Sequence, residues 1–194
     1  NKMIKIYSAL ITDFTQADYT NAYSLLENAL KEKIDAKKSE KDKMRSLAGI
    51  ILLYKGAFEL YKKTDFKIKF NKNGKPLCDF CFFNISHSQN RVVCVLSDEP
   101  VGMDIQKIKP IKRREKYKFF TDKENDYVNS GNEKNSLCER FTEIFTKKES
   151  ALKMLGLSLA DSKNIDTFSN RFKFMQQKDG EFITTVCLQN NTNL

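Results

Sequence analysis

The amino-acid sequence predicts an α+β protein made of two similar α/β halves. A strand, a long helix and paired strands follow one another in residues 3–97, and the same order of elements returns in residues 101–188. Short segments of strand character alternate with longer segments whose apolar residues have helical spacing. The two halves share little sequence identity, so the prediction depends on this pattern. We expect halves at 1–99 and 100–194 that meet at a cleft, where ligands commonly bind.

The first half begins with an alternating segment, residues 3–9, which predicts a strand. Residues 16–31 have helical spacing, and the charge-dense residues 30–43 are interpreted as a solvated loop and helix start. A phosphate-facing role for Lys33 is the alternative interpretation. Apolar residues at steps of three and four predict a core helix over 41–63. Strands are expected at 66–70, 80–86 and 91–97, with a turn at Asn73-Gly74.

The second half opens with a predicted strand at 101–106, directly after Pro100. A basic region follows, and then a short helix that begins near residue 121. A second long helix is predicted for 137–155, because apolar residues recur along one side and Gly156 follows the last turn. The remaining segments are a surface loop at 129–136 and strands at 171–175 and 181–188.

The composition favours an anionic partner without identifying it. The chain has 194 residues and a formal net charge of +9, and a basic surface attracts nucleic acid, acidic proteins and phosphate-rich small molecules alike. No helix-turn-helix, zinc-finger or RNP-like pattern is present, so we expect no nucleic-acid partner. We also expect no membrane partner and a cytoplasmic location, because no apolar run approaches roughly 18 residues and no signal peptide is evident.

The five cysteines predict reduced thiols, because their number is odd and no secretion signal accompanies them. Cys78 and Cys81 form a C-x-x-C pair. A zinc site needs about four ligands, and neither a second pair nor a suitably spaced histidine exists. Buried or edge-strand thiols are the favoured interpretation, and a metal-binding or redox role for the pair is the alternative.

Acidic side chains stand out on two predicted elements. Asp104 and Gln106 share one face of an otherwise small and apolar strand, and burial of an unpaired carboxylate is costly. Either a metal ion or a nearby lysine would remove this cost. On the long helix, Glu149 and Lys153 are either a surface pair worth roughly 0.2–0.5 kcal/mol or a metal-ligating carboxylate beside a phosphate-binding ammonium. Mg²⁺ commonly takes one or two carboxylates together with substrate phosphates and water.

The single histidine, His87, lies between two serines at the end of a hydrophobic strand, in a turn that can offer N–H and hydroxyl donors to a phosphate. A purely structural histidine is the alternative.

Three segments in this order resemble the 4′-phosphopantetheinyl transferase superfamily, in its surfactin-synthetase-activating (Sfp-like) branch. They read NISHS (84–88), GMDIQ (102–106) and FTKKESALK (145–153). The family shows N-x-S-H-S, G-[IV]-D-[IV]-E and [FW]-[ST]-x-K-E-[SA]-x-x-K. RSLAG (45–49), GKP (74–76) and FFTDKE (119–124) also resemble family segments. The resemblance extends over roughly residues 3–188.

The resemblance implies an enzyme that moves phosphopantetheine from coenzyme A to a serine of an acyl or peptidyl carrier protein, releasing 3′,5′-ADP. It implies Mg²⁺ bound by Asp104 and Glu149, with Gln106 as a further ligand. Lys153 would neutralise phosphate charge, and Glu149 or Glu124 would assist deprotonation of the serine.

For the co-substrate, the resemblance implies that Ser86 and His87 hold the 3′-phosphate of coenzyme A, and that Arg45, Lys75 and Lys33 contribute further contacts. Carrier proteins are typically acidic, so the basic charge should attract them. A monomeric pseudo-dimer is expected by analogy. The family strand commonly has Glu where this chain has Gln106, which predicts looser Mg²⁺ binding and leaves a coenzyme- or carrier-binding protein without turnover as an alternative.

Overall fold

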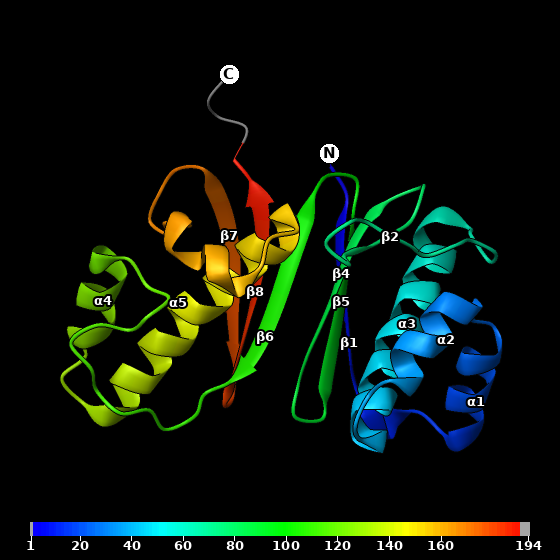
Figure 1. The fold of residues 1–194 in the computed structure, drawn as a ribbon, viewed down its shortest axis with the longest axis horizontal. Coiled ribbons are helices and arrows are strands. Elements are labelled where there is room, and N and C mark those ends of the chain that lie inside the picture. Colours follow the sequence, from blue (N-terminus) through cyan, green and yellow to red (C-terminus); the bar gives the residue numbers. More distant parts are fainter. Residues whose placement is uncertain (1, 191–194) are drawn as a thin grey trace. The chain divides into compact units, whose positions relative to one another are not determined.

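The computed structural model describes residues 2–190, which form two compact units divided between Glu99 and Pro100. Each unit combines helices with one three-stranded antiparallel sheet (Figure 1). The α+β class predicted from the sequence is therefore confirmed.

The sheet of the first unit has the strand order β1–β5–β4, with β1 at Ile4–Leu10, β4 at Phe82–Ser88 and β5 at Arg91–Ser97. Strands β4 and β5 form a tight hairpin in which Ser88 pairs with Arg91. The two-residue turn is Gln89–Asn90, and Gln89 has a φ of 58°. The strand therefore continues past His87, which lies in β4 and not in a turn.

Helix α3 (Glu40–Tyr61) packs on this sheet. Ser39 caps its start, because the Ser39 hydroxyl accepts from the Asp42 N–H. A Cβ built at Gly56 would lie 2.8 Å from the Tyr7 ring, so glycine permits the close approach of helix and strand. Near the end of the helix, the Tyr7 hydroxyl donates to Glu59 at 2.8 Å.

The smaller elements of this unit differ from the predictions. The helical segment predicted at 16–31 is two helices, α1 (Gln16–Ser24) and α2 (Asn28–Asp35), which follow the short 3₁₀ turn η1 (Ile11–Asp13). The predicted loop is wrong over residues 30–35, because buried Ile34 gives the charged α2 an apolar side. The strand predicted at 66–70 shortens to β2 (Lys69–Phe70), which pairs only with β3 (Pro76–Leu77).

The sheet of the second unit has the order β6–β8–β7, with β6 at Val101–Lys107, β7 at Phe172–Asp179 and β8 at Phe182–Gln189. Helix α5 (Lys134–Leu155) packs on β6 and β8. It begins three residues earlier than predicted and ends at Gly156, whose φ of 70° suits a residue without a Cβ. Helix α4 (Asp122–Asn129) and the 3₁₀ helix η2 (Leu159–Asn164) complete the unit, and η2 was not predicted.

The two units have the same internal connectivity. In each unit, a seven-residue first strand (β1 or β6) pairs with the strand that comes last in the chain (β5 or β8). A 22-residue helix (α3 or α5) packs on the sheet.

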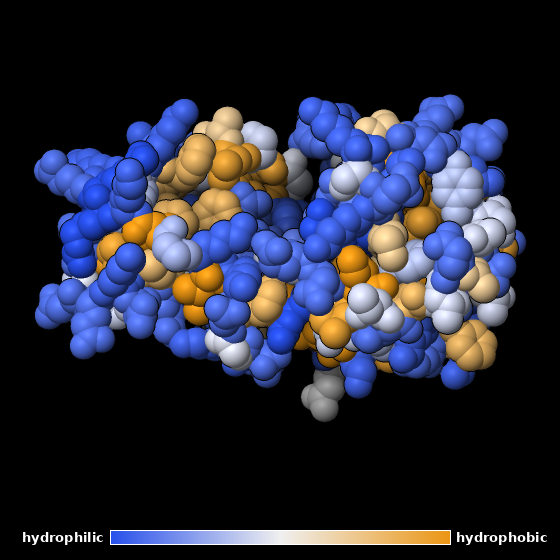
Figure 2. Space-filling view, turned by 90° about the horizontal axis from the view of Figure 1, so that it is seen from below, coloured by the Kyte–Doolittle hydropathy of each residue, from blue (hydrophilic) through white to orange (hydrophobic). Residues whose placement is uncertain are grey.

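The displayed face carries mostly hydrophilic side chains, with smaller apolar areas between them (Figure 2). None of the helices within residues 2–190 combines the length and apolar composition that crossing a bilayer requires.

Candidate active site

The candidate site of the second unit is built where helix α5 packs on strand β6. A Cβ at Gly102 would overlap the carbonyl oxygen of Ser150 and lie 2.9 Å from the Cβ of Met154. Only glycine therefore allows this contact between helix and strand. Residues two apart on a strand share a face, so Asp104 points toward the same helix.

Asp104 is a buried carboxylate whose two oxygens both have partners. It is 2% exposed. The Lys153 ammonium lies 2.6 Å from Oδ1, and the Gln106 amide donates to Oδ2 at 3.1 Å. The lysine-paired aspartate that the sequence allowed is therefore observed. Gln106 also lies beside Asp104, and its amide group stabilises the carboxylate where a glutamate would repel it.

Glu149 belongs to the same constellation. It lies on α5 one turn before Lys153 and is partly buried. Burial raises the pKa of the Glu149 carboxyl above its usual value, the negative charge of Asp104 raises it further, and Lys153 opposes both effects. The fold has therefore brought Asp104 together with Glu149 and Lys153, which lie 45 and 49 residues later in the chain.

This set of side chains is suited to a hard divalent cation shared with a ligand. Within residues 2–190, no cluster of three or more His, Cys, Asp or Glu side chains could hold a metal by itself. Two carboxylates and one amide oxygen are nevertheless protein ligands of the kind that Mg²⁺ uses when phosphates and water complete its coordination. Lys153 adds a positive charge at the same place. The residues fit the predicted ion only in combination with a phosphate-bearing ligand.

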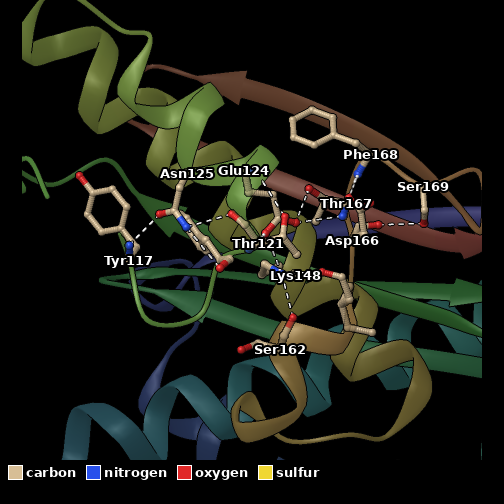
Figure 3. A network of polar contacts seen from close by, with 12 residues as sticks. Tyr117, Thr121, Glu124, Asn125, Lys148, Ser162, Asp166, Thr167, Phe168 and Ser169 are labelled. Carbon is tan, nitrogen blue, oxygen red and sulfur yellow. Dashed lines mark hydrogen bonds and ion pairs between the residues drawn. The ribbon is translucent and has the colours of Figure 1, made fainter. Parts of the chain in front are cut away.

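Glu124, the other predicted catalytic carboxylate, lies in a separate buried network (Figure 3). It is fully buried, and its Oε2 lies 2.8 Å from the Lys148 ammonium. The same oxygen accepts from the Thr121 N–H at 2.7 Å, as the capping box at the start of α4 requires. Oε1 accepts from the N–H and the hydroxyl of Thr167, both at 2.9 Å. Glu124 thus connects α4 to the segment after η2.

The sequence did not predict that Lys148 is the partner of Glu124. It is 1% exposed, and its ammonium also donates to the carbonyl oxygens of Ser162 at 2.8 Å and Ile165 at 2.5 Å. Burial lowers the pKa of Lys148, and Glu124 opposes that shift. The available signal was a lysine on the apolar side of the predicted helix, in line with Phe141, Phe145 and Leu152.

In the first unit, two of the residues predicted to bind coenzyme A lie near one carboxylate. The Arg45 guanidinium donates to the Gln89 carbonyl oxygen at 2.8 Å and pairs with Asp42. Hydrogen bonds from Ser39 and Arg45 lower the pKa of Asp42, and the positive charges of Arg45 and His87 add to the effect. Ser86 is buried and, as the neighbour of exposed His87 on a strand, points to the opposite face of β4.

The other two predicted coenzyme residues, Lys75 and Lys33, lie beside the β2–β3 hairpin. Lys75 directly precedes β3, its backbone N–H donates to Asn71 at 2.9 Å, and burial lowers the pKa of its side chain. The Lys33 ammonium lies 3.3 Å from the centre of the Phe70 ring, in a cation–π contact. Phe70 of β2 pairs with Pro76 of β3, so Lys33 contacts the same hairpin that contains Lys75.

Comparison with known proteins identifies the family. The model of the 4′-phosphopantetheinyl transferase superfamily matches residues 100–192. The 4′-phosphopantetheinyl transferase Sfp of Bacillus subtilis (strain 168) is 30% identical over 176 residues, which cover 87% of this chain and 76% of Sfp. This chain belongs to the 4′-phosphopantetheinyl transferase superfamily.

Other relatives agree with membership of this transferase superfamily. The 4′-phosphopantetheinyl transferase gsp of Aneurinibacillus migulanus is 40% identical over 119 residues, which cover 60% of this chain and only half of gsp. The transferase ffp of Bacillus subtilis is 30% identical over 175 residues, or 87% of this chain. The predicted Sfp-like family is therefore confirmed. The superfamily match includes Asp104, Glu149 and Lys153, whose individual roles stay predictions.

Proposed function

We propose that this chain transfers the 4′-phosphopantetheine group of coenzyme A to a serine hydroxyl of an apo acyl or peptidyl carrier protein. In this reaction the serine oxygen forms a bond to the β-phosphorus, and the bond from that phosphorus to the bridging oxygen breaks. The electron pair of the broken bond leaves with 3′,5′-ADP, and the serine loses its proton. The observation that supports this proposal most strongly is the group formed by buried Asp104 and the partly buried Glu149 and Lys153, in a chain of this superfamily.

The division of roles follows from charge and geometry. In phosphoryl transfer, catalysis depends mainly on positioning and on stabilising negative charge. Lys153 places a cation next to Asp104, in a position to neutralise phosphate oxygens and the leaving group. Asp104 and Glu149, with Gln106 at the edge, are the residues we assign to Mg²⁺. When bound, the ion supplies charge neutralisation for the pyrophosphate.

Glu149 is a better candidate than Glu124 for assisting deprotonation of the serine. A proton acceptor has to reach the proton that it removes. Glu149 is only partly buried and has a raised pKa, which suits a group that accepts a proton. Glu124 is 0% exposed, and Lys148, Thr121 and Thr167 occupy its oxygens. We therefore assign Glu124 a structural role.

The coenzyme contacts belong to the first unit in this proposal. Arg45 and His87 offer positive charge and donors for the 3′-phosphate, and Lys75 and Lys33 extend the cationic surface. Ser86 remains a predicted contact. The shared connectivity of the two units supports a pseudo-dimer within one chain. That the chain acts as a monomer with its active site in the cleft between its halves, and that it binds acidic carriers, remain parts of the proposal.

The experiment incubates the chain with coenzyme A, Mg²⁺ and a panel of apo carrier proteins, and measures the carrier mass. We expect one carrier to gain the mass of one phosphopantetheine. Asp104→Ala and Glu149→Gln should abolish the gain while circular dichroism shows a folded protein. The matched control is Glu139→Gln, which removes an acid of α5 that pairs with Lys178 on the surface. Full transfer by Asp104→Ala would overturn the assignment, and binding of coenzyme A without any transfer would favour a binding protein.

A further inference from the structure

The C-x-x-C pair of the first unit lies outside the residues assigned to transfer. Cys78 follows β3, Cys81 precedes β4, and the four residues 78–81 form the bend between these strands. Both thiols are half-buried, whereas Cys94, Cys138 and Cys187 are buried. The bend therefore contains the two most exposed cysteines of the described residues.

The two sulfur atoms are already close together. Their Sγ atoms lie 3.6 Å apart, and the Cys78 thiol donates to the Cys81 carbonyl oxygen at 3.3 Å. A disulfide needs an S–S distance of about 2.05 Å, so the two sulfurs have to approach by roughly 1.5 Å. Side-chain rotation can supply movement of this size without a change of fold.

Aromatic contacts hold the bend in place. Phe80, between the two cysteines, packs edge-on against Tyr61 at 5.3 Å and against Phe66 at 5.0 Å between ring centres. Tyr61 lies at the end of α3, and its hydroxyl donates to Asp98 at 3.0 Å. This anchoring keeps the thiols together, because Phe80, one of the two residues that join them, is held by its ring contacts.

The two thiols differ in reactivity. A hydrogen bond from the Cys81 thiol lowers the pKa of Cys78 to about 7, against the effect of burial, and backbone hydrogen bonds at Cys81 and Phe80 add to the lowering. The Cys78 thiolate and burial together raise the pKa of Cys81. The thiolate is the nucleophile in disulfide exchange, so the attacking sulfur is that of Cys78 and the resolving sulfur is that of Cys81.

We propose that Cys78 and Cys81 form a site of reversible thiol–disulfide modification, which reacts with disulfides of small thiols. In the first step the Cys78 thiolate attacks one sulfur of the small disulfide, forms a mixed disulfide and releases one small thiolate. In the second step the Cys81 thiol loses its proton and attacks Cys78 Sγ, and the second small thiolate leaves. The two cysteines are oxidised by two electrons, the small disulfide is reduced to two thiols, and a dithiol reverses the reaction.

The test uses the whole reduced chain and glutathione disulfide as the probe. After incubation near neutral pH, acid quenching and alkylation of the remaining thiols, peptide mass mapping locates each modification. We expect a Cys78–Cys81 linkage, with a mass lower by two hydrogens, while Cys94, Cys138 and Cys187 are alkylated only after denaturation. Dithiothreitol should restore the reduced mass. A native chain whose Cys78 and Cys81 stay reduced in excess glutathione disulfide would overturn the proposal, as would a linkage to Cys94.

Two serine variants test the order of the steps. Cys81→Ser should accumulate a glutathione adduct on Cys78, because the resolving thiol is missing. Cys78→Ser should react at least tenfold more slowly and form no linkage. Equal or faster glutathionylation of Cys81 in Cys78→Ser would contradict the assigned roles. If either variant misfolds, the alkylation rate of Cys78 in the unaltered chain decides the point: it should be half-maximal near pH 7, and a half-maximum near the value of an ordinary thiol, about 8.5, would refute the assignment.

Discussion

The buried ion pair between Lys148 and Glu124 makes the strongest prediction about stability. Lys148→Met keeps most of the side-chain volume but removes the ammonium from Glu124 and from the carbonyl oxygens of Ser162 and Ile165. Removal of one partner from a buried pair typically costs about 3–5 kcal/mol, because the other charge stays buried without compensation. Since a domain of this kind is stable by about 5–15 kcal/mol, the loss should be large. Glu124→Gln should have a cost of similar size.

The assay is a double-mutant cycle based on urea unfolding. The combination of Lys148→Met with Glu124→Gln leaves no buried charge, so it should cost less than the sum of the single changes by about 0.5–3 kcal/mol. The matched control is Lys178→Met, which breaks the 2.6 Å surface pair between Lys178 of β7 and Glu139 of α5, the helix that contains Lys148. This change should cost at most about 1 kcal/mol. Single changes that cost less than the control, or that add without coupling, would refute the reasoning.

Three further outcomes follow from the site. Gly102→Ala should destabilise the chain by about 1–3 kcal/mol, because the new methyl group overlaps the backbone of α5; urea unfolding measures this, and an unchanged midpoint would contradict the close packing. Because its pKa is raised, Glu149 binds its proton more tightly in the folded chain than in the unfolded chain, so the free energy of unfolding should fall as pH rises through these two pKa values. Glu149→Gln should remove that fall, which begins near the usual pKa of a glutamate and extends above it, and equal slopes for both proteins would count against it. Arg45→Met should raise the KM for coenzyme A by roughly 10- to 100-fold, the effect of a lost charged hydrogen bond, with little change in kcat in steady-state assays; an unchanged KM would remove Arg45 from the coenzyme site.

The sequence predicted the elements whose burial pattern is regular. The strand at 91–97 and the two long helices have clear apolar periodicity, and their observed bounds agree with the prediction to within a few residues. The region 16–35 was predicted less well, because α1 and α2 are short and largely polar and are separated only by the break at residues 25–27. Their helical state depends on contacts with α3, and local spacing does not report such contacts.

The candidate site was predicted only in part, because the sequence does not report contacts between residues that are far apart in the chain. The face shared by Gly102, Asp104 and Gln106 follows from strand geometry, and the pairing of Asp104 with Lys153 was one of the two alternatives. The sequence could not separate Glu124 from Glu149, since both are acids in family-like segments. Only the fold shows that one is fully buried against Lys148 and that the other lies next to Asp104.

The Tyr7–Glu59 hydrogen bond of the first unit occupies the same topological position as the Asp104–Lys153 pair of the second. Tyr7 and Asp104 are each the fourth residue of their strand, and Glu59 and Lys153 are each the twentieth residue of their helix. One copy of the repeated framework thus joins strand and helix through a phenol and a carboxylate, and the other through opposite charges. Only the second scaffold therefore places a lysine beside a buried aspartate, so under the proposed function we expect one transfer site per chain and one molecule of coenzyme A bound per chain at saturation.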